Sequence, residues 1–301
     1  MSFYSDLCAV LGADNIRTDE SLKNHTTFQT GGNCDYFLMP ENAEALRTSV
    51  RILQENQIPY FVLGRGSNIL VSDKGFRGAV ISLKQHFRNI EIYGTHMICG
   101  AGVMMHEAAK AAARAGLSGF EFASGIPGTI GGGLRMNAGA YGPEFKDIVT
   151  EAVLLLKDGN VRTFPNEELK FTYRSSVVKD LEAVVLSVTF LLEPGDPEGI
   201  FKKITELGIR RKDRQPLEYG SAGSTFKRPP GKYAGAVIEQ AGLKGYRYKN
   251  AGVSEKHANF VVNYGGATSE EIYHVIRHVQ EVVKEKDGLD LEPEVLFIGE
   301  F

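Results

Sequence analysis

The spacing of apolar residues predicts four long helices in this chain. Residues 42–57 form the first of them, because Ala45, Leu46, Val50 and Leu53 recur at intervals that place them near one helical face. Further helices are predicted over 103–117, about 198–212 and 269–286. The last of these has its apolar side formed by Ile272, Val275, Ile276, Val279 and Val283.

Shorter apolar runs between the helices predict strands. IPYFVLG (58–64) is typical of a buried strand that enters a glycine turn, and EAVLLLKDGNVRTF predicts two strands joined by a hairpin at Asp158-Gly159. AVVLSVTFLL (183–192) predicts another strand, and LEPEVLFIGEF predicts a strand at the end of the chain. Because strands and helices mix without a regular βαβ alternation, the pattern favours an α+β fold over a doubly wound sheet.

The strand pattern breaks at Pro194, Gly195 and Pro197, so we expect a boundary near residue 196. Together with the change of pattern near residue 80, it divides the chain into regions 1–80, 81–196 and 197–301.

Composition is that of a globular protein, with 43% hydrophobic and 24% charged residues in a chain of 301. A net charge of −3 gives no general case for nucleic-acid binding. The N-terminal residues lack a signal-peptide pattern, and the longest apolar segment is too short to span a bilayer, so we expect a cytoplasmic location and no membrane insertion. Cys8, Cys34 and Cys99 form no C-x-x-C pair, which favours packing roles over a zinc or redox site.

One segment, GFEFASGIPGTIGGGLRMNAGAYG (119–142), has eight glycines among twenty-four residues and still carries several large apolar side chains. Glycine lets a backbone approach a ligand closely, and Ser124, Thr129 and Asn137 add hydrogen-bonding groups, so a pyrophosphate loop is one interpretation. A set of tight turns explains the composition equally well.

A second glycine segment, GRGSNILVSD (64–73), directly follows the strand IPYFVLG and has Ser67 and Asn68 at its tip. Two such loops suit a long ligand with two phosphates. Ile69 stands where a dinucleotide fingerprint needs its third glycine, and no GxxxxGK[ST] occurs, so neither a Rossmann nor a P-loop site is predicted.

His274 and His278 are four residues apart on a predicted helix, the spacing of a shared metal site. The run HVIRH lacks the glutamate of H-E-x-x-H, so no metal is expected there.

Eight motifs in order along the chain resemble those of one flavoenzyme family, the UDP-N-acetylenolpyruvoylglucosamine reductases of bacterial cell-wall synthesis. They are NHTTFQTGG (24–32), VLGRGSNILVSD (62–73), SGIPGTIGGGLRMNAGAYG (124–142), FTYRSS (171–176), GSAGSTFKRP (220–229), AGLKGYR (241–247), HANFVVN (257–263) and LEPEV (291–295). The resemblance implies a two-subdomain FAD-binding unit of the vanillyl-alcohol-oxidase (PCMH) type, followed by a C-terminal α+β substrate-binding domain. The three regions given above would then be FAD-binding subdomain 1, FAD-binding subdomain 2 and the substrate-binding domain.

The same resemblance implies that both glycine segments bind FAD, through a cradle unlike the Rossmann one. The implied FAD-binding residues are Gly64, Arg65, Gly66, Ser67, Asn68, Ile69, Ser124, Gly125, Pro127, Gly128, Thr129, Gly132, Gly133, Ala138 and Gly139.

The implied reaction reduces UDP-N-acetylglucosamine enolpyruvate to UDP-N-acetylmuramate with NADPH as the reducing co-substrate. Hydride passes from flavin N5 to the enolpyruvyl methylene carbon, and the neighbouring carbon needs a proton and stabilisation of its charge. On the matching motif positions Ser224 is the proton donor, Arg174 binds the substrate carboxylate and the developing enolate, and Glu294 is an acid or polarising partner. Without the motifs these are a turn serine, a surface arginine and a strand-end glutamate. Glu292 and Glu300 lie near Glu294, and only the motif selects Glu294.

Substrate contacts are expected from the cations near the serine and from the HANFVVN motif. The candidates are Lys212, Lys227, Arg228, His257 and Asn259. Tyr173 is expected either to line the site or to pack. Longer family members insert a tyrosine-bearing loop after the arginine motif, whereas YRSSVVKDLEAVVLSV runs directly into a strand, so the chain is similar to the shorter type.

Two rival functions stay open on these residues. A different oxidoreductase on the same flavin fold would share the glycine loops and lack the trio Arg174, Ser224 and Glu294. A non-catalytic nucleotide-binding module would keep the glycine loops alone.

Overall fold

The computed structural model describes residues 3–301, which form two compact units, each built from separate stretches of the chain. The larger unit comprises residues up to Thr18, Tyr36–Arg65 and Gly78–Arg210. The smaller unit comprises Asp19–Asp35, Gly66–Arg77 and Arg211–Phe301. These units do not test the three-part division at residues 80 and 196, which stays a prediction.

The helices and strands mix as expected for an α+β fold. The α-helices are α1 (Phe3–Leu11), α2 (Ala43–Glu55), α3 (Met105–Arg114), α4 (Ile130–Arg135), α5 (Val177–Asp180), α6 (Pro197–Arg214), α7 (Ala234–Gln240) and α8 (Ser269–Asp287). The 3-10 helices are η1 (Ala13–Asn15), η2 (Leu22–His25), η3 (Glu121–Gly125), η4 (Phe145–Asp147) and η5 (Asn166–Leu169). All four helices predicted from periodicity, namely α2, α3, α6 and α8, are confirmed.

Among the described residues, 3–301, the strands form one four-stranded, one five-stranded and one three-stranded sheet and two isolated pairs. The first sheet has the order β1 (Ile16–Ser21), β2 (Asn33–Leu38), β5 (Phe76–Ser82), β3 (Tyr60–Leu63). The second has the order β10 (Val161–Pro165), β9 (Val149–Leu155), β11 (Val184–Leu191), β7 (His96–Gly100), β6 (Ile90–Tyr93). The third is β13 (Arg247–Tyr248), β14 (Ala251–Val253), β15 (Val261–Asn263), and the pairs are β12 (Glu193–Pro194) with β8 (Leu117–Ser118) and β16 (Leu296–Ile298) with β4 (Ile69–Val71).

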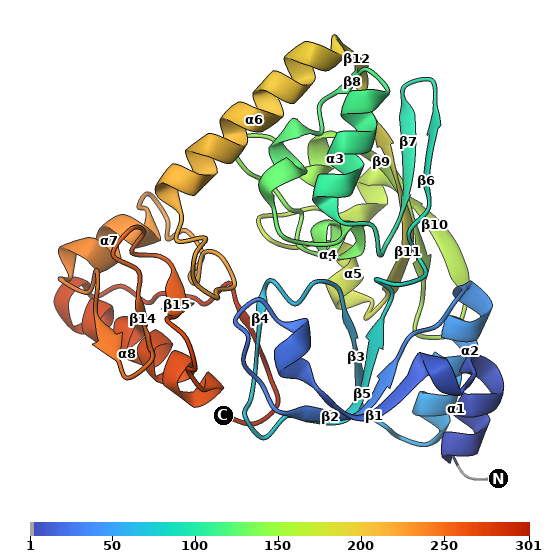
Figure 1. Ribbon diagram of the computed structural model, residues 1–301, viewed down its shortest axis with the longest axis horizontal. Helices are drawn as coiled ribbons and strands as arrows, with labels where there is room; N and C mark the ends of the chain where they lie inside the picture. Colours follow the sequence, from blue (N-terminus) through green and yellow to red (C-terminus); the bar gives the residue numbers. More distant parts are fainter. Residues whose placement is uncertain (1–2) are drawn as a thin grey trace. The chain divides into compact units, whose positions relative to one another are not determined.

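The five-stranded antiparallel sheet organises the larger unit, and α4 packs against its strands β7 and β11 (Figure 1). The predicted hairpin joins β9 to β10: Asp158 Oδ1 accepts a hydrogen bond from Asn160 N, and Gly159 has φ +84°. Edge-to-face rings pack in the core of the larger unit, with Phe190 4.9 Å from Phe120 and 5.4 Å from Phe145 between ring centroids.

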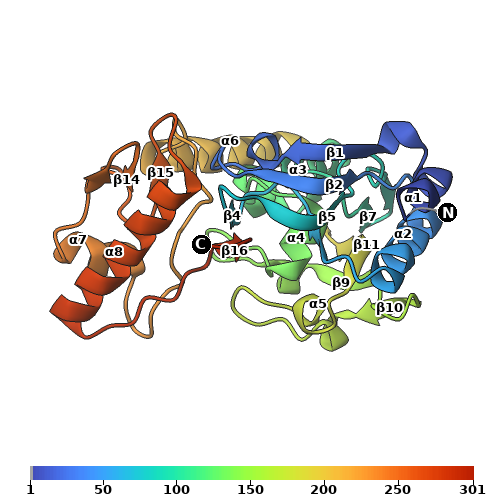
Figure 2. The same cartoon turned by 90° about the horizontal axis from the view of Figure 1, so that it is seen from below.

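The long helix α8 closes the core of the smaller unit and packs against β14 and β15 (Figure 2). Its predicted apolar side is confirmed: Ile272, Val275, Ile276, Val279 and Val283 are all fully buried. The helix begins at Thr268, whose Oγ1 accepts from Glu271 N at 3.1 Å, and it ends at Gly288 in the left-handed conformation.

The cysteines and the histidine pair of α8 lie in defined surroundings. Cys34 and Cys99 are fully buried, as packing residues should be, whereas Cys8 is only partly buried. Burial raises the pKa of the Cys34 thiol and of the Cys99 thiol to about 12. His274 and His278 stack on Tyr248 and Tyr246 at 3.9 and 4.3 Å. Over residues 3–301, no helix is both long and apolar enough to span a bilayer.

Candidate active site

The two glycine segments meet within the larger unit. A Cβ on Gly64 would lie 2.5 Å from Thr129 Oγ1, so only glycine lets the turn after β3 approach the second loop this closely. Thr129 Oγ1 in turn accepts a hydrogen bond from Gly132 N at 3.3 Å. Gly132 is exposed, and a Cβ added there would meet no atom within 4 Å other than Thr129 Oγ1. The loops therefore present exposed backbone at their meeting point, a surface that a phosphate-bearing ligand can approach.

Other glycines in these segments serve packing within the protein. A Cβ on Gly133 would lie 2.6 Å from Phe145 Cζ, and one on Gly139 would lie 2.6 Å from Glu144 Cγ. Gly66, in the smaller unit, has φ +70°, and a Cβ there would lie 2.1 Å from His25 O. Turns and close packing thus explain part of the glycine content, and the exposed backbone at Gly132 is what remains for a ligand.

The polar groups of the second segment are held by internal partners. Ser124 Oγ donates to Glu121 O at 2.7 Å. Asn137 is fully buried, its Nδ2 donates to Glu144 Oε2 and to Thr172 O at 2.9 and 3.1 Å, and its Oδ1 accepts from Lys146 N at 3.0 Å. Asn137 is therefore a structural residue, and the suggestion that it adds a ligand-facing group to the loop is wrong because its amide is already used.

Arg174 lies in a tight turn that Asn137 supports. Thr172 and Ser175 exchange backbone hydrogen bonds of 3.0 and 3.3 Å, which leaves Tyr173 and Arg174 at the tip. Arg174 has φ +56°, a conformation uncommon for a side chain of this size, and such outliers concentrate at functional sites. Its guanidinium lies 5.0 Å from the ring centroid of Tyr173, which is 47% exposed. Arg174 therefore lies at the tip of a turn whose backbone is held by Asn137 and by the bonds between Thr172 and Ser175.

Ser224 and Glu294 belong to neighbouring segments of the smaller unit. Glu294 N donates to Thr225 O at 2.8 Å, and Lys227 N donates to Glu292 O at 2.9 Å. Phe226 and Pro293 pair between these two bonds in an antiparallel bridge. The structure therefore brings together two of the three predicted catalytic residues, since Ser224 directly precedes the paired segment and Glu294 ends it.

The first glycine segment also reaches Glu294. Asn68 Nδ2 donates to Glu294 O at 3.0 Å, and Asn68 O accepts from Leu296 N at 3.0 Å. Ile69 then begins β4, which pairs in parallel with β16. Asn68 and Ile69, two of the residues expected to bind the cofactor, thus hold the segment that contains Glu294 and the strand β16 that follows it.

The three neighbouring glutamates differ in their contacts. Glu292 pairs with Lys227, and Glu300 pairs with Lys74 at 3.4 Å. Glu294 is half-buried and is bonded through both backbone groups to Thr225 and Asn68. Both the backbone N–H and the carbonyl of Glu294 are therefore held by neighbouring segments of the smaller unit.

The expected substrate contacts lie in different settings. Lys212 is exposed near the end of α6, and its carbonyl accepts from Lys256 Nζ. Arg228 is exposed, and its guanidinium lies 4.4 Å from the ring centroid of Tyr233. Asn259 differs from both: its side chain is buried and binds the backbone of Phe226, which is not the contact that the sequence predicts.

His257 is partly buried beside the same segment. Its Nδ1 accepts from Asn259 N at 3.2 Å, and its ring meets Phe260 edge-to-face at 4.8 Å. Burial lowers the pKa of His257 below the ordinary 6.5, and the charge of Lys244 adds to this effect while Glu239 opposes it. A neutral imidazole is therefore favoured in the folded protein.

Acidification is expected to destabilise the fold through His257. Because the unfolded chain binds the proton at higher pH than the folded chain, the free energy of unfolding falls as pH is lowered below about 6.5. His257→Gln keeps an acceptor for Asn259 N and removes the titration, so its urea unfolding midpoint should fall less between about pH 7 and pH 5. Equal falls in the unfolding midpoints of the wild type and of His257→Gln would show that His257 does not cause the loss of stability at low pH.

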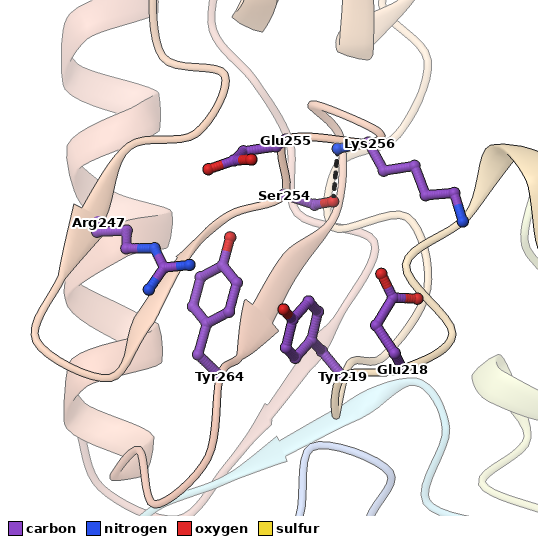
Figure 3. Close-up of a pocket in the computed structure, with 7 residues that line it drawn as sticks. All are labelled: Glu218, Tyr219, Arg247, Ser254, Glu255, Lys256 and Tyr264. Carbon is purple, nitrogen blue, oxygen red and sulfur yellow. Dashed lines mark hydrogen bonds between the residues drawn. The ribbon is translucent and has the colours of Figure 1, made fainter.

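A pocket that the sequence did not indicate lies in the smaller unit (Figure 3). Its volume is about 300 Å³, and it is lined by Glu218, Tyr219, Arg247, Ser254, Glu255, Lys256 and Tyr264. The Tyr219 and Tyr264 rings meet edge-to-face at 4.7 Å, and the Arg247 guanidinium lies 3.7 Å from the Tyr264 ring centroid. The lining residues are spread over positions 218–264, and only Arg247 belongs to one of the motifs quoted above, so the sequence does not mark the pocket as a whole.

Comparisons with known proteins identify relatives over the whole chain. The family model for the C-terminal domain of UDP-N-acetylenolpyruvoylglucosamine reductase matches residues 215–298, and an FAD binding domain model matches residues 34–165. A reductase of this name from Caldanaerobacter subterraneus subsp. tengcongensis is 47% identical, over 97% of this chain and 96% of the relative.

Solved structures agree with the sequence matches. The crystal structure of UDP-N-acetylenolpyruvylglucosamine reductase (MurB) from Thermus caldophilus superposes with a TM-score of 0.82 at 36% identity, and covers 94% of this chain and 100% of that one. p-Cresol methylhydroxylase superposes with a TM-score of 0.62 at 12% identity, over 95% of this chain and 87% of that one, which confirms the PCMH-type fold. The chain belongs to the UDP-N-acetylenolpyruvoylglucosamine reductase family.

Proposed function

We propose that the chain is an FAD-dependent reductase that converts UDP-N-acetylglucosamine enolpyruvate into UDP-N-acetylmuramate, a peptidoglycan precursor, with NADPH as reductant. The observation that carries this proposal, beyond membership of the family, is the hydrogen bond from Glu294 N to Thr225 O. It joins the segment of the candidate proton donor to that of the candidate acidic partner. We place the reaction in the cytoplasm, where the precursors of this pathway would be made.

The glycine segments fit the FAD that the fold implies. Exposed backbone at Gly132 and the close approach of Gly64 to Thr129 provide a surface without bulky side chains, which a phosphate-bearing ligand can approach closely. When bound, FAD supplies the hydride that is transferred to the enolpyruvyl methylene carbon. Of the fifteen predicted residues, those on the exposed part of the loops are the ones we assign to direct contact, whereas Gly66, Gly133, Asn68 and Ile69 support the protein itself.

Ser224 supplies the proton. Addition of hydride to the methylene carbon of the substrate leaves the electron pair of the former double bond on the adjacent carbon, next to the carboxylate. That carbon then takes a proton from the serine hydroxyl. A carbanion of this kind is strongly basic, so the serine needs correct placement more than activation by a base. Gly223, with φ +77° and open space around it, precedes a segment that is fixed from Thr225 onward.

Arg174 and Glu294 stabilise the charge that develops. A guanidinium binds a carboxylate or an enolate through two parallel hydrogen bonds, which strengthen as negative charge moves onto oxygen. Glu294 is assigned as the acid or polarising partner from its position in the LEPEV motif, and its own backbone N–H and carbonyl are both bonded. For the diphosphate we assign Lys212, Lys227 and Arg228, of which Lys227 must exchange its partner Glu292 for the substrate.

Gly64→Ala tests the assignment of the FAD loops. A methyl group at this position displaces Thr129 Oγ1 and weakens its bond to Gly132 N, so FAD retention should weaken about 10-fold, or about 1.4 kcal/mol. Gly208→Ala, on α6 with nothing within 4 Å, is the matched control: FAD retention should be unchanged, and stability should rise by up to about 1 kcal/mol. FAD released from the purified proteins measures the effect, and equal FAD contents would show that the approach of the two loops is unimportant for binding.

The reaction itself is tested by substrate-dependent turnover. The purified protein should contain FAD and consume NADPH only when UDP-N-acetylglucosamine enolpyruvate is present, and each NADPH consumed should yield one product molecule with two added hydrogens. A protein that carries FAD and oxidises an alcohol or sugar instead would be the rival enzyme on this fold. A protein without FAD would be the non-catalytic module.

A further inference from the structure

The geometry points to Asn259 as a positioning residue that fixes Ser224 through the backbone of the two residues after it. The inference rests on the proposed role of Ser224 as proton donor. It replaces the expected contact between Asn259 and the substrate.

Both polar atoms of the Asn259 side chain bond the backbone of one residue, Phe226. Its Oδ1 accepts from Phe226 N at 3.0 Å, and its Nδ2 donates to Phe226 O at 2.9 Å. The residue is 7% exposed, and its own carbonyl accepts from Thr225 N at 2.7 Å. The side chain therefore pairs with Phe226 as a neighbouring strand would, and three bonds from one residue hold the two residues that follow Ser224.

The opposite edge of the same segment bonds residues 292–294. Thr225 O accepts from Glu294 N, and Lys227 N donates to Glu292 O. On the Asn259 side, Thr225 Oγ1 also accepts from Val261 N at 3.0 Å. The segment that carries Ser224 thus lies between Asn259 on one edge and the Glu294 segment on the other, so that both candidate catalytic residues depend on one hydrogen-bonded block.

Ser224 lies where this block begins. Gly223, before it, has a left-handed backbone and open space where a side chain would be, and Thr225, after it, is 1% exposed. The position of the serine hydroxyl is therefore determined mainly from the Thr225 side. A catalytic group displaced by about 1 Å can lose on the order of 100-fold in rate.

The test compares half-reactions of the FAD-loaded enzyme. In Asn259→Ala, reoxidation of the reduced flavin by the enolpyruvyl substrate should slow about 10- to 100-fold, whereas reduction by NADPH stays at the wild-type rate. The matched control is Asn263→Ala, which removes another buried amide of the smaller unit, one that bonds Phe28 O, Gly265 N and Ala267 N. It should lose stability similarly and keep the wild-type rate of reoxidation.

A double variant separates positioning from general support. If Asn259 acts through Ser224, then Asn259→Ala should slow reoxidation no further once Ser224→Ala is present. A full additional loss in the double variant, or equal effects of Asn259→Ala and Asn263→Ala, would overturn the inference while leaving the proposed function intact. If Ser224→Ala itself reoxidises at the wild-type rate, it is the proposed function of the serine that fails.

Asn259→Asp covers the case in which the alanine variant does not fold. It keeps an acceptor for Phe226 N and places a second oxygen, in place of the donor, beside Phe226 O, so reoxidation should be slower than in wild type. A wild-type rate of reoxidation in Asn259→Asp would contradict the inference.

Discussion

Ser224→Ala is expected to lose about 10²- to 10⁴-fold in the step that consumes the enolpyruvyl substrate. The alanine cannot deliver a proton to the carbon beside the carboxylate, which is the role assigned to the serine hydroxyl. Reduction of the bound flavin by NADPH should stay at the wild-type rate, because it precedes the proton transfer. Rapid-mixing absorbance measurements on each half-reaction provide the comparison.

Ser221→Ala is the matched control for this serine. Ser221 lies in the same glycine-containing loop, three residues earlier, and has no assigned role in the chemistry. It should retain both half-reactions. A Ser224→Ala enzyme with near wild-type turnover would show that the proton comes from elsewhere.

Arg174→Lys is expected to lower kcat by about 10²- to 10³-fold, with flavin reduction by NADPH unchanged. Lysine keeps the positive charge but lacks the planar fork that binds carboxylate and enolate oxygens in parallel. The loss should appear in kcat more than in KM, because the bonds strengthen as charge develops on the substrate.

Arg162→Lys is the corresponding control in the larger unit. Arg162 pairs with Glu168 on an exposed surface and lies 4.4 Å from the ring centroid of Phe164, so lysine there should leave kcat unchanged. Equal kcat values for Arg174→Lys and wild type would mean that charge alone suffices at position 174.

Features set by local periodicity were predictable from the sequence. The five apolar positions of α8 and the Asp158-Gly159 hairpin both appear as predicted, since each depends on residues a few positions apart. The order of the motifs gave the PCMH-type fold and the family, which composition alone could not give.

Features set by long-range contacts were not predictable. Asp73 accepts from Ser269 N and Glu270 N at 2.9 Å each, a contact across almost two hundred residues that ties the first glycine segment to the start of α8. The roles of Asn259 and Asn137 were not predictable from the sequence for the same reason. A buried asparagine that braces a backbone and one that binds a ligand look identical in a sequence, because the partner of the amide decides the role and lies elsewhere in the chain.

The central claim is tested most directly by an anaerobic titration of the wild-type protein followed by its visible absorbance spectrum. NADPH should bleach the flavin band, and UDP-N-acetylglucosamine enolpyruvate, added after the excess NADPH is removed, should restore it with one equivalent of UDP-N-acetylmuramate formed. A band that NADPH bleaches and the enolpyruvyl substrate leaves bleached would contradict the account.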